Sequence, residues 1–110
     1  MKNFNEEVLQ NIAFQIILES GQGRTLINEA FFSMRNKDFV VAINKLEKAH
    51  QFIIRAHNVQ NDLIQNYASC NKIEIDVLMV HAQDHLMSTQ TLHELAFEML
   101  FLHEQVANVI

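Results

Sequence analysis

The chain has 110 residues, the size of one domain, and 49% of them are hydrophobic, which allows a core but a thin one. The formal net charge of −5 argues against nucleic acid as a partner, because no basic patch exists to displace phosphate counterions. Proline is absent and there are only two glycines, a composition that favours helices over a chain with many sharp turns. Because Cys70 is the single cysteine, no intrachain disulfide can form.

The sequence offers no targeting or membrane-spanning segment. The start "MKNFNEEVLQN" lacks the basic residues and apolar core of a signal peptide. No apolar run reaches the roughly 18 residues that a membrane span needs. The cysteine content gives no sign of an oxidising compartment. These features predict a soluble, cytoplasmic protein that forms one domain over residues 1–110 and does not insert into a membrane.

Two polar clusters divide the chain into three segments of helical period, "RNKD" at 35–38 and "ASCNK" at 68–72. In the first cluster Asp38 suits a helix N-cap, and Asn36 can adopt a turn conformation. Three helices of roughly 45 Å joined by short turns predict an all-α, antiparallel three-helix bundle with up-down-up topology.

The first two segments each carry one apolar face, formed by residues spaced three and four apart. The first face comprises Leu9, Ala13, Ile16, Ser20, Gly23, Ile27, Ala30 and Met34, and the second Phe39, Ala42, Leu46, Ala49, Ile53, Ala56, Gln60, Leu63 and Tyr67. Alternation of large residues with alanine suits close helix contact. Ser20 and Gly23 narrow the first face at its middle, which indicates either close helix packing or room for a ligand or partner.

The third segment, from about Ile75 to near the C-terminus, carries a face interrupted by polar residues. At 100° per residue this face comprises Val77, His81, Asp84, Ser88, Leu92, Leu95, Met99, Leu102 and Val106, with His85 on its margin. The opposite side, with Gln83, Gln90, Glu94 and Glu98, is expected to be solvated. Because the chain has more large apolar residues than one narrow core needs, we expect a homo-oligomer that buries the third-segment face between subunits.

Three chemistries use histidine and aspartate at this spacing. His81 and His85, at i and i+4, share a helix face and could ligate a metal with Asp84 as a third ligand. Glu47 and His50 have the Glu-x-x-His spacing of di-iron bundles, but that architecture needs two such motifs and four helices. In general acid–base catalysis Asp84 would orient His81, although no phosphate loop or nucleophile elbow supplies the rest of a reaction centre.

The third chemistry is a histidine that carries a phosphoryl group itself. A neutral imidazole nitrogen is a good nucleophile near pH 7, and its phosphoramidate can pass the group onward. Such a site needs a positioned imidazole, donors for the phosphate oxygens and an apolar rim for a partner. His85 and Gln83, together with any donors that a neighbouring chain supplies, fit these needs beside His81. The sequence leaves the roles of His50, His57 and Cys70 open, and predicts ordinary helix positions for His93 and His103.

The string "VHAQDHLMS" at 80–88, supported by "AHNVQ" at 56–60 and "ESGQGRT" at 19–25, resembles the IIA component of the lactose/cellobiose-type sugar phosphotransferase system over nearly the whole chain. The resemblance implies cytoplasmic three-helix subunits that assemble as a homotrimer, a nine-helix bundle. It implies a phosphotransferase in which the phosphocarrier protein HPr phosphorylates a histidine. That histidine then passes the group to a cysteine of the IIB component during uptake of a β-disaccharide such as lactose, cellobiose or chitobiose.

The resemblance also assigns roles to residues. His81 matches the phosphorylated histidine, His85 its supporting histidine, and Gln83 a glutamine expected near the phosphoryl group. Asp84 matches a buried carboxylate at the threefold axis, where a divalent cation such as Mg²⁺ can neutralise three converging charges, and no organic cofactor is implied. The competing interpretation is a metal-binding or adaptor helical bundle without phosphotransfer activity.

One stretch departs from the family's pattern. Gln22 and Gly23 stand where related sequences often carry an acidic residue and alanine, next to Arg24. This difference concerns the rim of the site, and the central string at 80–88 is unaffected by it.

Overall fold

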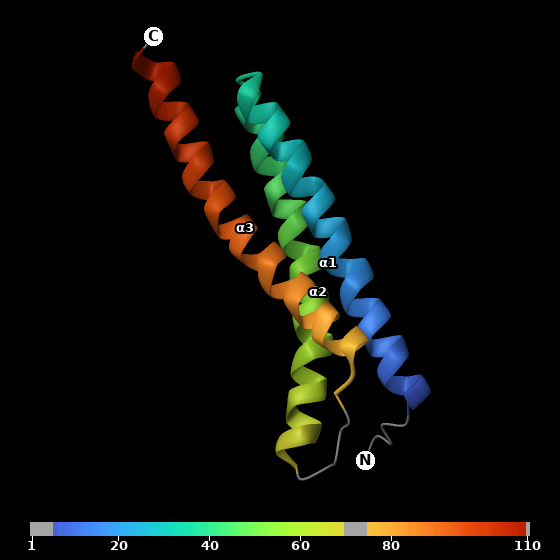
Figure 1. Cartoon of the computed structure of the whole chain (residues 1–110). Coiled ribbons are helices and arrows are strands. Elements are labelled where there is room, and N and C mark those ends of the chain that lie inside the picture. The colour runs from blue at the N-terminus through green and yellow to red at the C-terminus, as the bar shows by residue number, and fades with distance from the viewer. Residues whose placement is uncertain (1–5, 70–74, 110) are drawn as a thin grey trace.

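Three long helices make up the fold in the computed structural model, which describes residues 6–69 and 75–109. They are α1 (Glu6–Arg35), α2 (Phe39–Ala68) and α3 (Val77–Val109), and no strand occurs within those ranges. Figure 1 shows α1 and α2 running side by side as an antiparallel hairpin, with α3 packed along it. The molecule measures 58 × 20 × 20 Å. The predicted all-α three-helix bundle is confirmed, and none of the described helices has the length and apolarity to cross a membrane.

The connection between α1 and α2 is a tight turn at the predicted cluster 35–38. The Lys37 amide donates to the Met34 carbonyl at 3.0 Å, and the Asp38 amide donates to the Ser33 carbonyl at 2.8 Å. This pair of bonds is the Schellman motif, which requires a left-handed residue just past the helix end. Lys37 takes that conformation, with φ of 61°. Asn36 lies in the same turn, as predicted.

Each of the later helices begins at an aspartate. The Asp38 carbonyl accepts the first helical bond of α2, from the Ala42 amide at 3.0 Å, so Asp38 occupies the N-cap position as predicted. Asp76 caps α3 with its side chain, because its Oδ1 accepts a hydrogen bond from the Met79 amide at 2.9 Å. The predicted break at 68–72 lies partly outside the described residues, which do not include Cys70.

The core confirms the faces predicted for the first two helices. The buried side of α1 comprises Leu9, Ala13, Ile16, Ser20, Gly23, Ile27, Ala30, Ser33 and Met34, and that of α2 comprises Ala42, Leu46, Ala49, Ile53, Ala56, Gln60 and Leu63. Phe39 is half-buried, and the Tyr67 side chain lies outside the described part of the chain. The periodicity of these segments was therefore sufficient to find their inward faces.

Gly23 lies at a close contact between α1 and α2. A Cβ placed on Gly23 would lie 3.4 Å from the Ala49 carbonyl oxygen and 3.5 Å from Ile53 Cγ1. Such contacts leave little space for a side chain, so the glycine serves close helix packing. Of the two explanations for the narrow face, close packing fits at this position.

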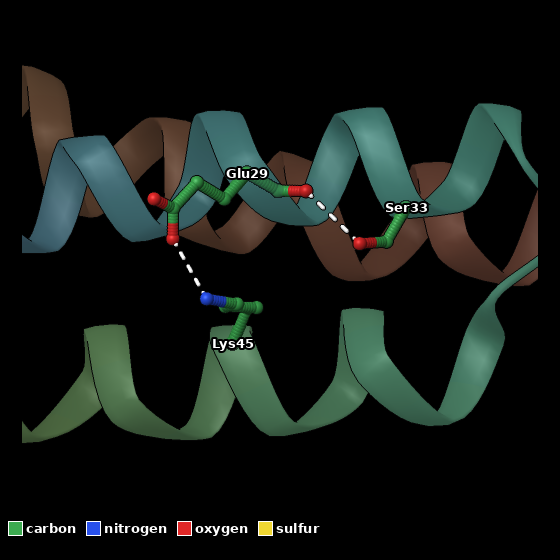
Figure 2. Close-up of polar contacts among 3 residues, drawn as sticks. All are labelled: Glu29, Ser33 and Lys45. Carbon is green, nitrogen blue, oxygen red and sulfur yellow. Dashed lines mark hydrogen bonds and ion pairs between the residues drawn. The ribbon is translucent and has the colours of Figure 1, made fainter.

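An ion pair joins the same two helices at the surface. Figure 2 shows Lys45 of α2 reaching Glu29 of α1, whose Oε1 accepts a hydrogen bond from Lys45 Nζ at 2.9 Å. Ser33 donates to the Glu29 carbonyl oxygen at 3.2 Å, also visible in Figure 2. Because both charged side chains remain partly exposed, the pair contributes at most about 1 kcal/mol.

Helix α3 packs against the hairpin with a different face from the one singled out in the sequence. Its buried residues are Met79, Ala82, Leu86, Thr89, His93, Ala96 and Leu100. The stripe expected between subunits stays exposed or half-exposed in this single chain. The opposite side is not simply solvated, since Gln83 and Gln90 are half-buried and hydrogen-bonded to α2. Beyond Leu100 the described part of α3 has no buried residue, and Figure 1 shows its C-terminal end standing apart from the hairpin.

Removing the α3 cap should destabilise the fold. We expect Asp76→Ala to lower the free energy of unfolding by about 1 kcal/mol, because the Met79 amide would lose its acceptor. Asp76→Asn retains an acceptor oxygen and should stay close to the wild type. Urea unfolding at one fixed protein concentration measures both variants. Equal losses in the two variants would show that the cap bond is not what Asp76 contributes.

Candidate functional site

The histidines singled out in the sequence form a pair on α3. The rings of His81 and His85 meet edge to face, with centroids 6.1 Å apart and an angle of 70° between their planes. His81 is exposed, whereas His85 is half-buried against α1. Their spacing of four residues places them one turn apart on the helix, so the α-helical geometry alone brings the two rings together.

Ser20 of α1 fixes the inner histidine. Its Oγ lies 2.7 Å from His85 Nδ1 and 2.6 Å from the Ile16 carbonyl oxygen one turn earlier on α1. Ser20 is fully buried, so water does not compete for either contact. On the same helix, a Cβ added to Gly21 would lie 3.8 Å from His85 Cε1, which leaves the ring close to the α1 backbone. The ring of His85 is thereby held in one orientation.

The surroundings of His85 favour its neutral form. Burial lowers the pKa of His85 below its usual value near 6.5, and the positive charges of Arg24 and of protonated His81 lower it further, while Asp84 partly opposes them. At neutral pH the inner imidazole is therefore uncharged. A neutral imidazole keeps one nitrogen lone pair, which can accept a proton or a hydrogen bond.

Arg24 adds a cation at the edge of the site. It lies one turn after Ser20 on α1, and its Nε is buried without a hydrogen-bond partner. A surface depression of about 450 Å³ adjoins it between α1 and α3, lined by Arg24, Met87, Ser88, Thr91, Leu92 and Leu95. The depression combines a guanidinium, two hydroxyls and an apolar wall, a set that suits a small anion next to a protein partner.

The other two predicted site residues lie differently within one chain. Gln83 is on the side of α3 that faces α2, where its Oε1 accepts a hydrogen bond from Gln60 and its Nε2 contacts Met79 Sδ at 3.6 Å. The structure therefore does not bring Gln83 to His81 within the same chain. Asp84 is exposed, one residue from His85, and lies among apolar residues of the outer face of α3.

The metal-binding alternative finds no support in the arrangement of side chains. Across residues 6–69 and 75–109, no three histidine, cysteine, aspartate or glutamate side chains converge as a metal site. His81, His85 and Asp84 do not form such a group, and neither do Glu47 and His50. A single chain brings one Asp84 carboxylate to the outer face of α3, so the divalent cation that we anticipated does not fit one chain by itself.

The remaining histidines of α2 and α3 connect those helices. His93, expected to be an ordinary helix residue, is buried, and its Nε2 donates to the Leu46 carbonyl at 2.9 Å. His50 stacks on His93 with centroids 5.5 Å apart, and His57 Nε2 donates to Gln90 Oε1 at 2.8 Å. Each of these rings already has a packing or hydrogen-bonding role between the two helices.

Sequence reasoning missed Ser20 as a partner of the histidine pair. Ser20 had been placed on the inward face of α1, and "ESGQGRT" had been noted as a supporting string, but neither observation connected it to His85. Spacing along one helix predicts neighbours on that helix only. A contact across 65 residues depends on the relative rotation of α1 and α3, which periodicity leaves undetermined.

Comparison with known proteins finds one family and its members over most of the chain. The family described as "PTS system, Lactose/Cellobiose specific IIA subunit" matches residues 11–104. The lichenan-specific phosphotransferase enzyme IIA component of Bacillus subtilis is 43% identical over 102 residues, which cover 93% of this chain and 92% of that protein.

Solved structures agree with the sequence comparison. The crystal structure of PtcA from S. mutans superposes with a TM-score of 0.91 at 50% identity, covering 92% of this chain and 99% of that one. IIA(Chitobiose) of Escherichia coli, solved in complex with HPr, superposes with a TM-score of 0.79 at 32% identity and covers 90% of this chain and 96% of that one. Because the family match spans most of the chain and the relatives align over nearly their full lengths, the chain belongs to the lactose/cellobiose-specific IIA subunits of the sugar phosphotransferase system.

Proposed function

We propose that this IIA subunit accepts a phosphoryl group from phospho-HPr on His81 and passes it to a cysteine of a IIB component. The observation that carries the proposal is the pair formed by exposed His81 and half-buried His85 in a member of this family. HPr as the donor is supported by the complex of the E. coli chitobiose IIA protein with HPr. IIB as the acceptor is what the family resemblance implies.

The geometry favours His81 as the residue that is phosphorylated. An incoming partner must bring its phosphorus atom in line with a ring nitrogen, which requires an accessible imidazole. His81 meets this need because its side chain is exposed, whereas His85 is tied to Ser20 through Nδ1. His85 then supports the reaction from one turn away, and the nearby Arg24 offsets negative charge on the phosphoryl group.

The transported sugar is proposed to be a β-disaccharide such as lactose, cellobiose or chitobiose. Relatives of this chain are named for lichenan, N,N'-diacetylchitobiose and lactose. A IIA subunit exchanges a phosphoryl group with other proteins and need not contact the sugar. The sugar assignment therefore rests on the names of the relatives and on the family match.

We further propose that the subunit assembles as a homotrimer around α3, giving a nine-helix bundle. This helix exposes large apolar side chains beyond its intrachain face, namely Val77, Val80, Met87, Leu95, Phe97, Phe101, Leu102, Val106 and Val109. A helix that is apolar on most of its surface is typical of a buried position. Association of three copies through these residues would remove an apolar surface that a monomer leaves in water.

Asp84 is proposed to lie near the threefold axis of this trimer. It is exposed in one chain and interrupts the apolar outer face of α3 between Val80 and Met87. Three carboxylates brought together in a water-poor interface repel one another, so each needs a proton, a shared cation such as Mg²⁺ or a hydrogen-bond donor. Within a chain Gln83 faces α2, so the place near the phosphoryl group that the family resemblance gives this glutamine would need a contact between Gln83 of one subunit and His81 of the next.

Replacement of the proposed acceptor should abolish labelling. The assay incubates the chain with HPr, phosphoenolpyruvate and the enzyme that phosphorylates HPr from phosphoenolpyruvate. The wild type should gain the mass of one phosphate group, in a linkage that acid breaks and base does not. His81→Gln should gain none. His85→Gln should still be labelled, but roughly 100-fold more slowly, at the low end of what a proton-transfer group contributes. His103→Gln is the matched control, because His103 lies on α3 with the same orientation as His85, five turns away.

The same variants also test two alternatives: exchanged roles of His81 and His85, and an adaptor without phosphotransfer activity. Normal labelling of His81→Gln with loss of labelling in His85→Gln would reverse the two roles. No labelling of the wild type under conditions where a known IIA protein is labelled would favour an adaptor without phosphotransfer activity. Circular dichroism and sedimentation of each variant establish that folding and assembly are retained.

The trimer is tested at Asp84. Asp84→Leu should strengthen assembly by about 1–4 kcal/mol, the range found when buried charges give way to well-packed apolar side chains. Glu94→Leu is the control, because Glu94 lies on α3 beside the groove that faces α2 and should leave assembly unchanged. If a cation neutralises the three carboxylates, a chelator should weaken the wild-type trimer and leave Asp84→Leu unaffected.

Sedimentation and light scattering decide the outcome. A wild-type chain that remains monomeric across micromolar concentrations, with and without divalent ions, contradicts the trimer. A trimer weakened by Asp84→Leu would mean that Asp84 makes a favourable bond elsewhere than on the axis.

A further inference from the structure

The hydrogen bonds of Ser20 determine which nitrogen of His85 carries the proton. Ser20 Oγ has one hydrogen to donate and lies at bonding distance from three groups. They are the Ile16 carbonyl oxygen at 2.6 Å, His85 Nδ1 at 2.7 Å and, at a longer 3.3 Å, the Ile17 carbonyl oxygen. A carbonyl oxygen can only accept, and two oxygens 2.6 Å apart need a hydrogen between them. The serine hydrogen therefore goes to Ile16. Ser20 then accepts from His85, so Nδ1 carries the His85 proton.

The second nitrogen of His85 is left as an acceptor. In a neutral imidazole one nitrogen donates and the other accepts, so Nδ1–H leaves a lone pair on Nε2. The charged groups that act on this ring are Arg24 of α1 and His81 and Asp84 of α3, and the described part of α2 adds no charged group to this balance. Burial and the cation beside it hold the pKa of His85 below its usual value, so the lone pair is free at neutral pH.

We propose that Ser20 is a positioning residue, an inference that rests on the phosphotransfer proposed above. Its hydroxyl holds His85 as the Nδ1–H tautomer, so that His85 Nε2 takes the ring proton of His81 as the phosphoryl group arrives. The exposed His81 side chain lies one turn away, with its ring edge-on to that of His85. Hydrogen bonds between catalytic groups are often long in the free protein and shorten during the reaction.

Each transfer forms one bond to phosphorus, breaks another and moves one proton between His81 and His85. The unprotonated nitrogen of His81 forms the new N–P bond. The N–P bond of the phosphohistidine in HPr breaks and leaves its electron pair on that ring, which carries a proton on its other nitrogen and so departs as a neutral imidazole. The other nitrogen of His81 gives its proton to His85 Nε2, which makes His85 an imidazolium and His81 a neutral phosphoimidazole. When the thiolate of the IIB cysteine forms an S–P bond, the N–P bond of His81 breaks and its electron pair stays on the His81 ring. The proton returns from His85 to the other nitrogen of His81, so both rings are again neutral imidazoles.

The charges near His85 favour transfer of the proton from His81 to His85 when the phosphoryl group arrives, and its return when the group leaves. Before transfer, Arg24 and burial keep His85 neutral and ready to accept. Arrival of the negatively charged phosphoryl group on His81 stabilises a nearby positive charge and raises the pKa of His85. Departure of that group lowers the pKa again and returns the proton. The sequence of charge changes thus matches the sequence of proton transfers.

The lowered pKa of His85 predicts a pH effect on stability. Between the folded-state pKa and about 6.5 the unfolded chain binds a proton that the folded chain does not. The wild type should therefore lose stability relative to His85→Gln as the pH falls through that window, and the difference between them should be constant above it. Urea midpoints at several pH values and one protein concentration measure this. A difference independent of pH would contradict the shift.

The tautomer is tested directly by ¹⁵N NMR of the full-length chain, with the His85 signals assigned by their loss in His85→Gln. The wild type at neutral pH should show a protonated Nδ1 and an unprotonated Nε2. Ser20→Ala should lose this preference. The matched control is Ser33→Ala, since Ser33 is another buried serine of α1 that bonds the carbonyl four residues earlier, and it should leave the His85 signals unchanged. An Nε2–H tautomer in the wild type overturns the proposal.

The role in transfer is tested by labelling rates. Ser20→Ala should slow labelling by HPr roughly tenfold, a part of the proton-transfer contribution, and should cause no further slowing in a His85→Gln background. Equal slowing in both backgrounds, or a changed tautomer with an unchanged rate, overturns the proposal. If the wild type has the Nδ1–H tautomer but is never labelled by HPr, the proposed phosphotransfer function is refuted. The proton-acceptor role of His85 is then refuted with it.

Discussion

Close approach of the helices is the constraint on which the rest of this structure depends. Each helix places small residues at regular intervals along its inward face, such as Ala42, Ala49 and Ala56 on α2 and Ala82 and Ala96 on α3. The distance between packed helix axes follows the size of the side chains at the contact. On α1 the small residues at the middle are Ser20 and Gly23, so the hydroxyl of Ser20 reaches a ring on α3. The histidine pair is positioned by the same packing that forms the core.

Helix α3 has apolar side chains on two different faces. One face, including Met79, Leu86 and Leu100, packs into the core, and the outer face exposes large apolar side chains around Asp84. The cost of leaving those side chains in water is of the order of 1–2 kcal/mol for each one that assembly would bury. The histidine pair therefore lies on a helix whose outer surface is open to partners and, in the proposed trimer, to further copies.

In the proposed transfer, the electrostatics of the pair account for the use of two histidines. An imidazole that accepts a phosphoryl group must be neutral at first, and it must be able to lose its remaining proton as the new bond forms. His85 is kept neutral by burial and by Arg24, so it has a lone pair available at neutral pH. A solvent-exposed base in the same place would compete with water and with bulk protonation. Partial burial against α1 removes both effects for the inner ring and leaves the outer one accessible.

By itself the sequence determined the three helices, the inward faces of the first two and the pairing of His81 with His85, because these depend on periodicity and on contacts one turn apart. It did not identify the inward face of α3, since that helix is apolar on several sides and its periodicity favoured the outer stripe. It placed Asn36 in the first turn, but only the backbone geometry identifies Lys37 as the left-handed residue there.

Tertiary structure alone decided the contacts between helices far apart in sequence. The Ser20–His85 bond, the burial of His93 beneath α2 and the turning of Gln83 toward Gln60 each depend on the rotation of one helix about its axis relative to another. Such rotations are set by the packing of many side chains at once, so no local pattern encodes them. The sequence therefore predicted the histidine pair, and the packing of α1 against α3 decided which of its two rings is held and which is exposed.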